Sequence, residues 1–364
     1  MRDPEHLNVR ALPITHPAGA ELILHGGNLD AARKRFPGAP EPWIDLSTGI
    51  NPVPFPIPPL PTEVWSRLPT RSEEDALLAT AATRYRVANS EMIVAASGTQ
   101  ALIQLLPRLA TKSDVAILGP TYEEHRACWT RQGHRVSLVN NLEQSDRADV
   151  VIVVNPNNPT GRIIPPDALR AVAATLANKN GLLIVDEACV DVLPEAASIA
   201  SELSPSTIVL RSFGKTYGLA GLRLGFAIAE ASLAKLIRAE LGPWAVSGPA
   251  LSIGKAALGD AQWLAATTAR LESGRQRLDA MLEAARFTVL GGTPLFRLAR
   301  HSEAINIVEK LGRHGIHVRV FADEPQWLRF GLPGDEVAWE RLSIALSGGM
   351  TPQRYTPRRS RIRP

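Results

Sequence analysis

Two short runs made only of apolar residues constrain the fold more than any other part of the chain: residues 150–154 (VVIVV) and 182–185 (LLIV). A strand with one face in solvent alternates apolar and polar residues, whereas a run without alternation is typical of a strand buried on both faces. Similar segments alternate with amphipathic stretches between residues 62 and 265, which predicts an α/β domain with a mostly parallel sheet. Its strands are expected near residues 92–95, 114–118, 134–139, 150–154, 182–186, 207–211 and 224–229.

The segments on either side of this large domain, 62–265, differ from it in pattern. Residues 1–61 are expected to form an N-terminal arm that ends in a proline-rich connector, which is extended because each proline fixes φ and excludes helix. Residues 266–350 are expected to form a smaller α+β domain against which the arm packs. Residues 351–364 are expected to be a disordered basic tail.

The smaller domain is predicted from a mixture of strand-like and helical segments. A long helix over 251–285 is expected to lead into it from the large domain. Its strands are expected at 287–290, 316–321 and 327–330, and its helices near 302–314 and 335–346.

Composition and charge exclude several classes of partner. The net charge is +4, but five arginines lie in the last eleven residues, so the body of the chain is nearly neutral and no nucleic-acid partner is expected. A weak phosphate-binding role for the tail stays open. No apolar stretch approaches the roughly 18 residues of a membrane span. The two cysteines, Cys128 and Cys189, make neither a disulfide framework nor a metal site, so we expect a cytoplasmic protein without a metal.

Polar residues follow both apolar runs where the strands would end. The first run leads into residues 155–161 (NPNNPTG) and the second into Asp186 and Glu187. Open α/β sheets bind ligands at the carboxyl ends of their strands. Asn, Pro and Gly also form ordinary turns, but a carboxylate at the buried end of a strand is costly unless it is paired. We therefore expect Asp186 in a site, and Glu187 in a structural role.

One lysine lies among glycines in residues 212–226 (SFGKTYGLAGLRLGF), with Arg223 eight residues after Lys215. An amine attacks a carbonyl only after losing its proton, which a nearby cation and partial burial both favour. A glycine-rich turn with a solvent-facing lysine is the alternative. Farther upstream, residues 97–100 (SGTQ) stand between an expected strand and an expected helix, where free backbone N–H groups can bind an anion or a Ser or Thr can simply cap the helix.

Together, these segments resemble the fold-type I enzymes that use pyridoxal 5'-phosphate, in the class I and II aminotransferase family. The resemblance implies that Lys215 binds the cofactor as a Schiff base. It further implies that Asp186 pairs with the protonated ring nitrogen and that the Asn158 amide bonds to the 3-oxygen. The implied ligands of the cofactor phosphate are Gly98, Thr99, Gln100, Ser212 and Arg223. In the segment GPTY, Tyr122 would stack on the ring, although a half-buried tyrosine at a helix start is nearly as compatible with the sequence.

The substrate contacts follow from the same resemblance. Arg329 matches the small-domain arginine that clamps a substrate carboxylate, with Asn158 beside it, and Arg319 is a candidate for a second anionic group. Two arm segments, HGGN at 25–28 and LSTGINP at 46–52, resemble those of L-threonine-O-3-phosphate decarboxylases, close relatives of histidinol-phosphate aminotransferases. In that branch of the family His25 and Asn51 would help to bind the substrate phosphate, and the enzyme would be a homodimer.

Two positions depart from the family pattern. Cys189 stands where the aminotransferases carry a tyrosine that donates to the 3-oxygen, and a thiol is a poor donor. Leu68 stands where relatives carry a tyrosine that reaches the phosphate across the dimer. Both departures favour decarboxylation of a phosphorylated amino acid over the first alternative, an aminotransferase. A non-catalytic binding module of the same fold is the second alternative, and the intact Lys215, Asp186, Asn158 and Arg223 argue against it.

Overall fold

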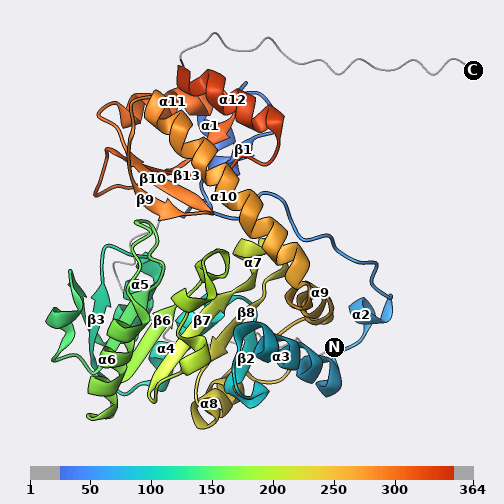
Figure 1. The fold of residues 1–364 in the computed structure, drawn as a ribbon, viewed down its shortest axis with the longest axis vertical. Helices are drawn as coiled ribbons and strands as arrows, with labels where there is room; N and C mark the ends of the chain where they lie inside the picture. The colour runs from blue at the N-terminus through green and yellow to red at the C-terminus, as the bar shows by residue number, and fades with distance from the viewer. Residues whose placement is uncertain (1–24, 348–364) are drawn as a thin grey trace, which may run out of the picture.

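The computed structural model describes residues 25–347, and the expected tail, 351–364, lies outside them. A seven-stranded sheet forms the centre of the larger unit, in the order β2-β8-β7-β6-β5-β3-β4 (Figure 1). Strand β8 runs antiparallel to both of its neighbours and the remaining pairs are parallel, so the expected mostly parallel sheet is present. The strands are β2 (Ile93–Ala96), β3 (Asp114–Leu118), β4 (Arg135–Val139), β5 (Val150–Val154), β6 (Leu182–Asp186), β7 (Thr207–Ser212) and β8 (Gly225–Ile228).

Both faces of this sheet are covered, as the unbroken apolar runs require. In β5, Val151 and Val153 pack into one hydrophobic cluster, whereas Val150 and Ile152 pack into another on the opposite face. Three helices contribute to the first cluster: α3 (Arg71–Tyr85), α6 (Pro166–Ala177) and α9 (Gly248–Gly259). The second cluster is closed by α4 (Thr99–Leu109), α5 (Glu123–Arg131) and α8 (Ala231–Leu241).

The smaller unit contains a four-stranded antiparallel sheet in the order β12-β13-β10-β9. Its strands are β9 (Thr288–Thr293), β10 (Phe296–Arg300), β12 (Arg319–Val320) and β13 (Trp327–Gly331), and its helices are α11 (Ala304–Arg313) and α12 (Glu336–Ser347). The arm contributes β1 (Ile44–Asp45), which pairs in parallel with β11 (Ile316–His317). The helix α10 (Ala261–Ala284) runs along one side of both units (Figure 1).

Three local expectations were wrong. The single helix expected over 251–285 is broken at Asp260, whose side chain accepts a hydrogen bond from the Trp263 N–H and so starts α10 anew. The single strand expected over 316–321 is split at Val318 into two strands that belong to different sheets. Strand β10 was not expected at all, because arginines interrupt its short apolar pattern.

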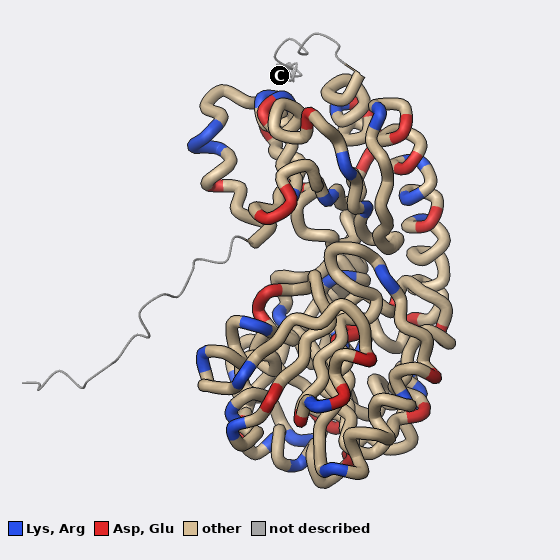
Figure 2. Tube along the Cα trace, turned by 90° about the vertical axis from the view of Figure 1, so that its left-hand side faces the viewer, with Lys and Arg blue, Asp and Glu red and all other residues tan. Residues whose placement is uncertain are grey.

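Two lobes are visible from the side, joined where α10 and the arm pass between them (Figure 2). Acidic and basic residues occur on both lobes (Figure 2). Within residues 25–347, no helix combines the length and the apolar character needed to cross a membrane.

Candidate active site

The site residues predicted from the sequence converge at one edge of the large sheet. Asp186 ends β6 and Ser212 ends β7, while the loops that carry Asn158 and Tyr122 follow β5 and β3. Because β8 is antiparallel, its first residue, Gly225, lies between the last residues of β2 and β7. The sequence therefore delivers side chains from four strands, and a glycine from β8, to one edge, where α/β sheets bind ligands.

The predicted phosphate cradle lies at the start of α4, where a glycine meets an arginine side chain. Gly98 has φ +81°, and a Cβ atom placed on it would lie 2.7 Å from Nη2 of Arg223, so the guanidinium packs directly over the glycine. A Cβ on Gly225 would lie 2.6 Å from the backbone nitrogen of Thr99. No side chain caps α4, and Ser212 makes no capping bond to the short turn that follows it. Gly98, Thr99, Ser212 and Arg223 thus lie together at the uncapped start of α4, although the Gly98 N–H donates to the Ala96 oxygen at 2.7 Å and one Arg223 nitrogen donates to the Ala220 oxygen at 3.3 Å.

The Gln100 side chain points away from the other four predicted phosphate ligands, Gly98, Thr99, Ser212 and Arg223. Its Nε2 donates to Oε2 of Glu124 at 2.7 Å, and its Oε1 accepts from the Tyr122 hydroxyl at 3.2 Å. Tyr122 precedes α5, and burial raises the pKa of its hydroxyl. Gln100 therefore orients the predicted stacking tyrosine in this structure.

Asp186 is buried and fully hydrogen bonded. Its Oδ2 lies 2.9 Å from Nε2 of His125, and its Oδ1 accepts from the Ala188 N–H at 3.0 Å. Burial opposes ionisation of this carboxyl, but the His125 contact and the nearby Lys215 overcome it and lower the pKa of Asp186 below its ordinary value. An ionised carboxylate inside the protein can pair with a cationic ring nitrogen. The sequence analysis missed His125, although a histidine three residues after Tyr122 was a visible signal.

The Lys215 amine lies beside the thiol that replaces the family tyrosine. Nζ of Lys215 is 3.5 Å from Sγ of Cys189, and Cys189 is buried. The backbone oxygen of Lys215 accepts from the Asn51 N–H at 2.8 Å. The Asn51 amide donates to the Thr216 oxygen at 2.8 Å and accepts from the Val53 N–H at 3.1 Å. Asn51 is buried with both side-chain polar groups bound within the protein, so it anchors the arm to the lysine turn, contrary to the expectation that it contacts the substrate phosphate.

Two arginines of the small sheet face each other at the opposite side of the site. Arg329 donates to Oδ1 of Asn158 and, at 2.5 Å, to the backbone oxygen of Ser47. Burial, aided by nearby Arg319, lowers the pKa of Arg329 to about 10. Arg319 lies directly opposite Arg329 in the β12–β13 register, and burial lowers its pKa as well. No carboxylate of the described residues forms an ion pair with either guanidinium, so the pair can accept an anionic ligand.

His25 is the first residue of the described chain, and it lies near Tyr122. Nε2 of His25 is 2.8 Å from Oε1 of Glu124. The centroids of the His25 and Tyr122 rings are 6.0 Å apart. Glu124 is a second residue that the sequence analysis missed. A lone glutamate at a helix start gives no signal by itself, because acids there are favoured by the helix dipole alone.

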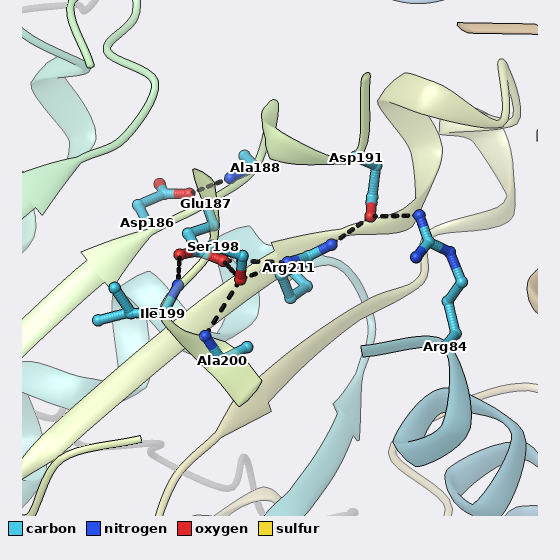
Figure 3. Close-up of polar contacts among 9 residues, drawn as sticks. All are labelled: Arg84, Asp186, Glu187, Ala188, Asp191, Ser198, Ile199, Ala200 and Arg211. Carbon is cyan, nitrogen blue, oxygen red and sulfur yellow. Dashed lines mark hydrogen bonds and ion pairs between the residues drawn. The ribbon is translucent and has the colours of Figure 1, made fainter. Parts of the chain in front are cut away.

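A buried ion-pair network lies directly behind the site (Figure 3). Successive residues of a strand point to opposite faces, so Glu187 and Arg211 lie on the far side of Asp186 and Ser212. Glu187 accepts from Ser198 at 2.6 Å, from the Ile199 N–H at 2.9 Å and from Arg211 at 3.0 Å. Glu187 thus has the structural role expected for it. Asp191 extends the network by binding Arg211 and Arg84.

Comparison with known proteins identifies the family. Residues 67–343 match the family model for aminotransferase class I and II. The chain is 41% identical over 334 residues to a threonine-phosphate decarboxylase of Pseudomonas aeruginosa, covering 91% of this chain and 99% of the relative. It is 45% identical over 330 residues to a threonine-phosphate decarboxylase of a Sinorhizobium species, covering 89% and 98%.

Solved structures confirm the expected fold. A histidinol-phosphate aminotransferase from Sinorhizobium meliloti, in complex with pyridoxal-5'-phosphate, superposes with a TM-score of 0.77 at 23% identity, covering 93% of this chain and 98% of that chain. An L-threonine-O-3-phosphate decarboxylase from Porphyromonas gingivalis gives 0.66 at 20% identity, covering 79% and 91%. Both likenesses concern the fold, whereas the family model and the curated relatives carry the assignment: this chain belongs to the class I and II aminotransferase family.

Proposed function

We propose that this protein is a pyridoxal 5'-phosphate enzyme that decarboxylates L-threonine O-3-phosphate to (R)-1-amino-2-propanol O-2-phosphate, a step of cobalamin biosynthesis. The observation that carries the proposal is the likeness to two threonine-phosphate decarboxylases over about nine tenths of this chain. The Gly98–Arg223 turn, and the Arg319–Arg329 pair that meets no carboxylate of the described residues, support it, because both the cofactor and this substrate carry a phosphate.

The side chains present fit the cofactor. The glycine and guanidinium cradle at Gly98 and Arg223 suits a phosphate dianion in shape and charge. Asp186 is held ionised although it is buried, which suits a cationic ring nitrogen. The Lys215 amine lies against the Cys189 thiol and near Asp186, and no carboxylate of the described residues holds it in an ion pair.

The chain's own residues would then divide the work of decarboxylation. When bound, the cofactor withdraws electrons from a bond to the substrate's α-carbon. Arg329, with Asn158 beside it, would hold the substrate carboxylate, and the group held perpendicular to the ring is the one that leaves. Arg319 and His25 would contact the substrate phosphate, and Asn51 would hold the arm against the lysine turn. Lys215 Nζ would return a proton to the α-carbon.

An aminotransferase acting on histidinol phosphate is the second candidate. The family model that residues 67–343 match is that of class I and II aminotransferases, which favours this candidate. The same cradle, aspartate and lysine would serve either reaction. Cys189 weighs against the aminotransferase, because it replaces the tyrosine donor of that family and a thiol is a weaker hydrogen-bond donor than a phenol.

We also propose that the enzyme acts as a homodimer in the cytoplasm. Large apolar side chains are exposed on one region of the large unit, with Trp65, Leu68 and Trp244 each about 60% exposed or more. A groove of about 560 Å³ separates Pro69 from Trp244 in this region. Exposed apolar clusters of this kind are typical of protein interfaces. Both cysteines are free thiols, as suits a reducing compartment.

Replacing Lys215 tests whether this site is where the chemistry occurs. Lys215→Ala is expected to abolish both the visible absorbance of the bound cofactor and the release of CO2 from L-threonine O-phosphate, because no other described lysine lies at the cradle. Lys179→Ala is the matched control: that side chain is exposed and bonds to the Asp146 oxygen at 2.7 Å. An active, coloured Lys215→Ala protein would refute the proposal.

A further inference from the structure

Glu124 joins three segments that belong to different parts of the chain. Its side chain is 12% exposed at the start of α5 in the large unit. One oxygen binds His25 of the arm and the other binds Gln100 of α4, which in turn accepts from Tyr122. One carboxylate thus sets the orientation of an arm residue, a residue beside the phosphate cradle and the predicted stacking ring.

The arm turn that carries His25 continues this connection to Arg329. The Gly27 N–H donates to Oγ of Ser47 at 2.7 Å, and a Cβ atom on Gly26 would clash with the backbone oxygen of Ser47. That same oxygen accepts from Arg329. Contacts therefore run from Glu124 in the large unit through the arm to the arginine of the small unit.

A carboxylate at the position of Glu124 weakens the binding of a phosphorylated ligand, so its presence is explained only if it serves another residue of the site. Glu124 faces the region of Tyr122, and a free carboxylate there would repel a dianion. Its sequence neighbour Glu123 shows the ordinary alternative, an exposed acid paired with Arg126 one turn away at 2.8 Å. Glu124 instead has both oxygens occupied by site residues. A carboxylate only accepts hydrogen bonds, so Nε2 of His25 is the donor to Glu124. Nδ1 is the remaining nitrogen, and it donates to a phosphate oxygen in the imidazolium form, in which both ring nitrogens carry a proton.

We infer that Glu124 is a positioning residue, which holds His25 with Nδ1 directed to the substrate phosphate and couples that contact to Gln100 and Tyr122. The inference rests on the proposed function, because it takes the substrate to be a phosphorylated amino acid. Glu124 itself is expected to act through His25 and not to touch the substrate.

The test uses the holoenzyme and its Glu124→Gln variant, with Glu123→Gln as the matched control. Glu124→Gln keeps the shape but weakens a charged hydrogen bond, so the KM for L-threonine O-phosphate should rise about tenfold or more. The kcat should stay within roughly threefold, and inhibition by inorganic phosphate should weaken by a factor similar to that of KM. Glu123→Gln should change none of these values. A Glu124→Gln enzyme with unchanged KM and unchanged phosphate inhibition would overturn the inference.

His25→Asn provides a second variant on the exposed arm, where folding is at little risk. If Glu124 acts through His25, the double variant should be no worse in KM than the worse single variant, whereas independent roles would make the losses multiply. Direct titration of each holoenzyme with inorganic phosphate, followed by ³¹P NMR, gives a readout without turnover. A wild type that binds phosphate but releases no CO2 would contradict the proposed function while leaving the Glu124 comparison measurable.

Discussion

Replacing His125 by phenylalanine isolates the interaction that keeps Asp186 ionised. Phenylalanine preserves the ring that meets Tyr122 edge-on, with centroids 6.2 Å apart, but it removes the donor 2.9 Å from Asp186. Removing one partner of a buried charge pair costs about 3–5 kcal/mol. Lys215 and the Ala188 N–H still stabilise the carboxylate, so we expect the lower end, about 3 kcal/mol at pH 7.5. For a chain of 364 residues, that loss corresponds to a fall in Tm of roughly 4 °C.

The loss should depend on pH with a definite sign. In the wild type the pKa of Asp186 is lowered, so its contribution to stability is present above the ordinary pKa of about 3.9 and is lost as pH falls through the native value. Without His125, burial is the dominant influence and raises the pKa of Asp186. The variant then gains relative stability as the carboxyl takes up a proton, so its deficit against the wild type should shrink on acidification.

The assay is urea or thermal unfolding of the apoproteins between pH 8 and pH 5, with His134→Phe as control. His134 is also buried and packs on an aromatic ring, Trp129, but its ring nitrogens meet only backbone groups of Pro107 and Ser113. Its replacement should cost about 1 kcal/mol, without the pH dependence of a carboxyl group. Equal deficits for both variants at every pH, or a His125→Phe deficit that grows on acidification, would refute the reasoning.

Two further changes test the cradle and the network behind it. Gly98→Ala places a methyl group 2.7 Å from the Arg223 guanidinium at a positive φ, so the variant should lose its cofactor on dialysis, whereas Gly221→Ala, with open space around its Cβ, should retain it. Asp191→Asn removes a buried anion from two arginines and should lower the free energy of unfolding by about 3 kcal/mol in urea titration. The control Glu195→Gln removes an exposed ion pair with Arg86 and should change the free energy of unfolding by less than about 1 kcal/mol. Equal losses of unfolding free energy in the two variants would count against a stabilising buried network.

Much of the site could be predicted because the sequence places its residues at strand ends. Asp186, Asn158 and Ser212 each follow a strand that the apolar pattern identified, and the ends of parallel strands meet at one edge. The turn at Gly98 was placed between a strand and a helix in the same way, whereas the resemblance to the family named Arg223.

The site residues that were not predicted make contacts between helices, strands and the arm. Such contacts depend on how these elements pack, which the sequence pattern of a single element does not determine. His125 and Glu124 lie on one helix turn, and only the packing of α5 on the sheet decides that one meets Asp186 and the other meets the arm. The break at Asp260 depends on a single cap that competes with a continuous apolar pattern. The split at Val318 arises because the arm supplies β1 as a partner for β11, a pairing between segments about 270 residues apart.

The most direct test of the account is turnover of L-threonine O-phosphate by the wild-type holoenzyme without any 2-oxo acid. The account predicts release of one CO2 and one 1-amino-2-propanol O-phosphate for each substrate consumed, at a rate that added 2-oxoglutarate does not increase. Absence of CO2, together with transfer of an amino group from histidinol phosphate to 2-oxoglutarate, would contradict it and make the protein an aminotransferase.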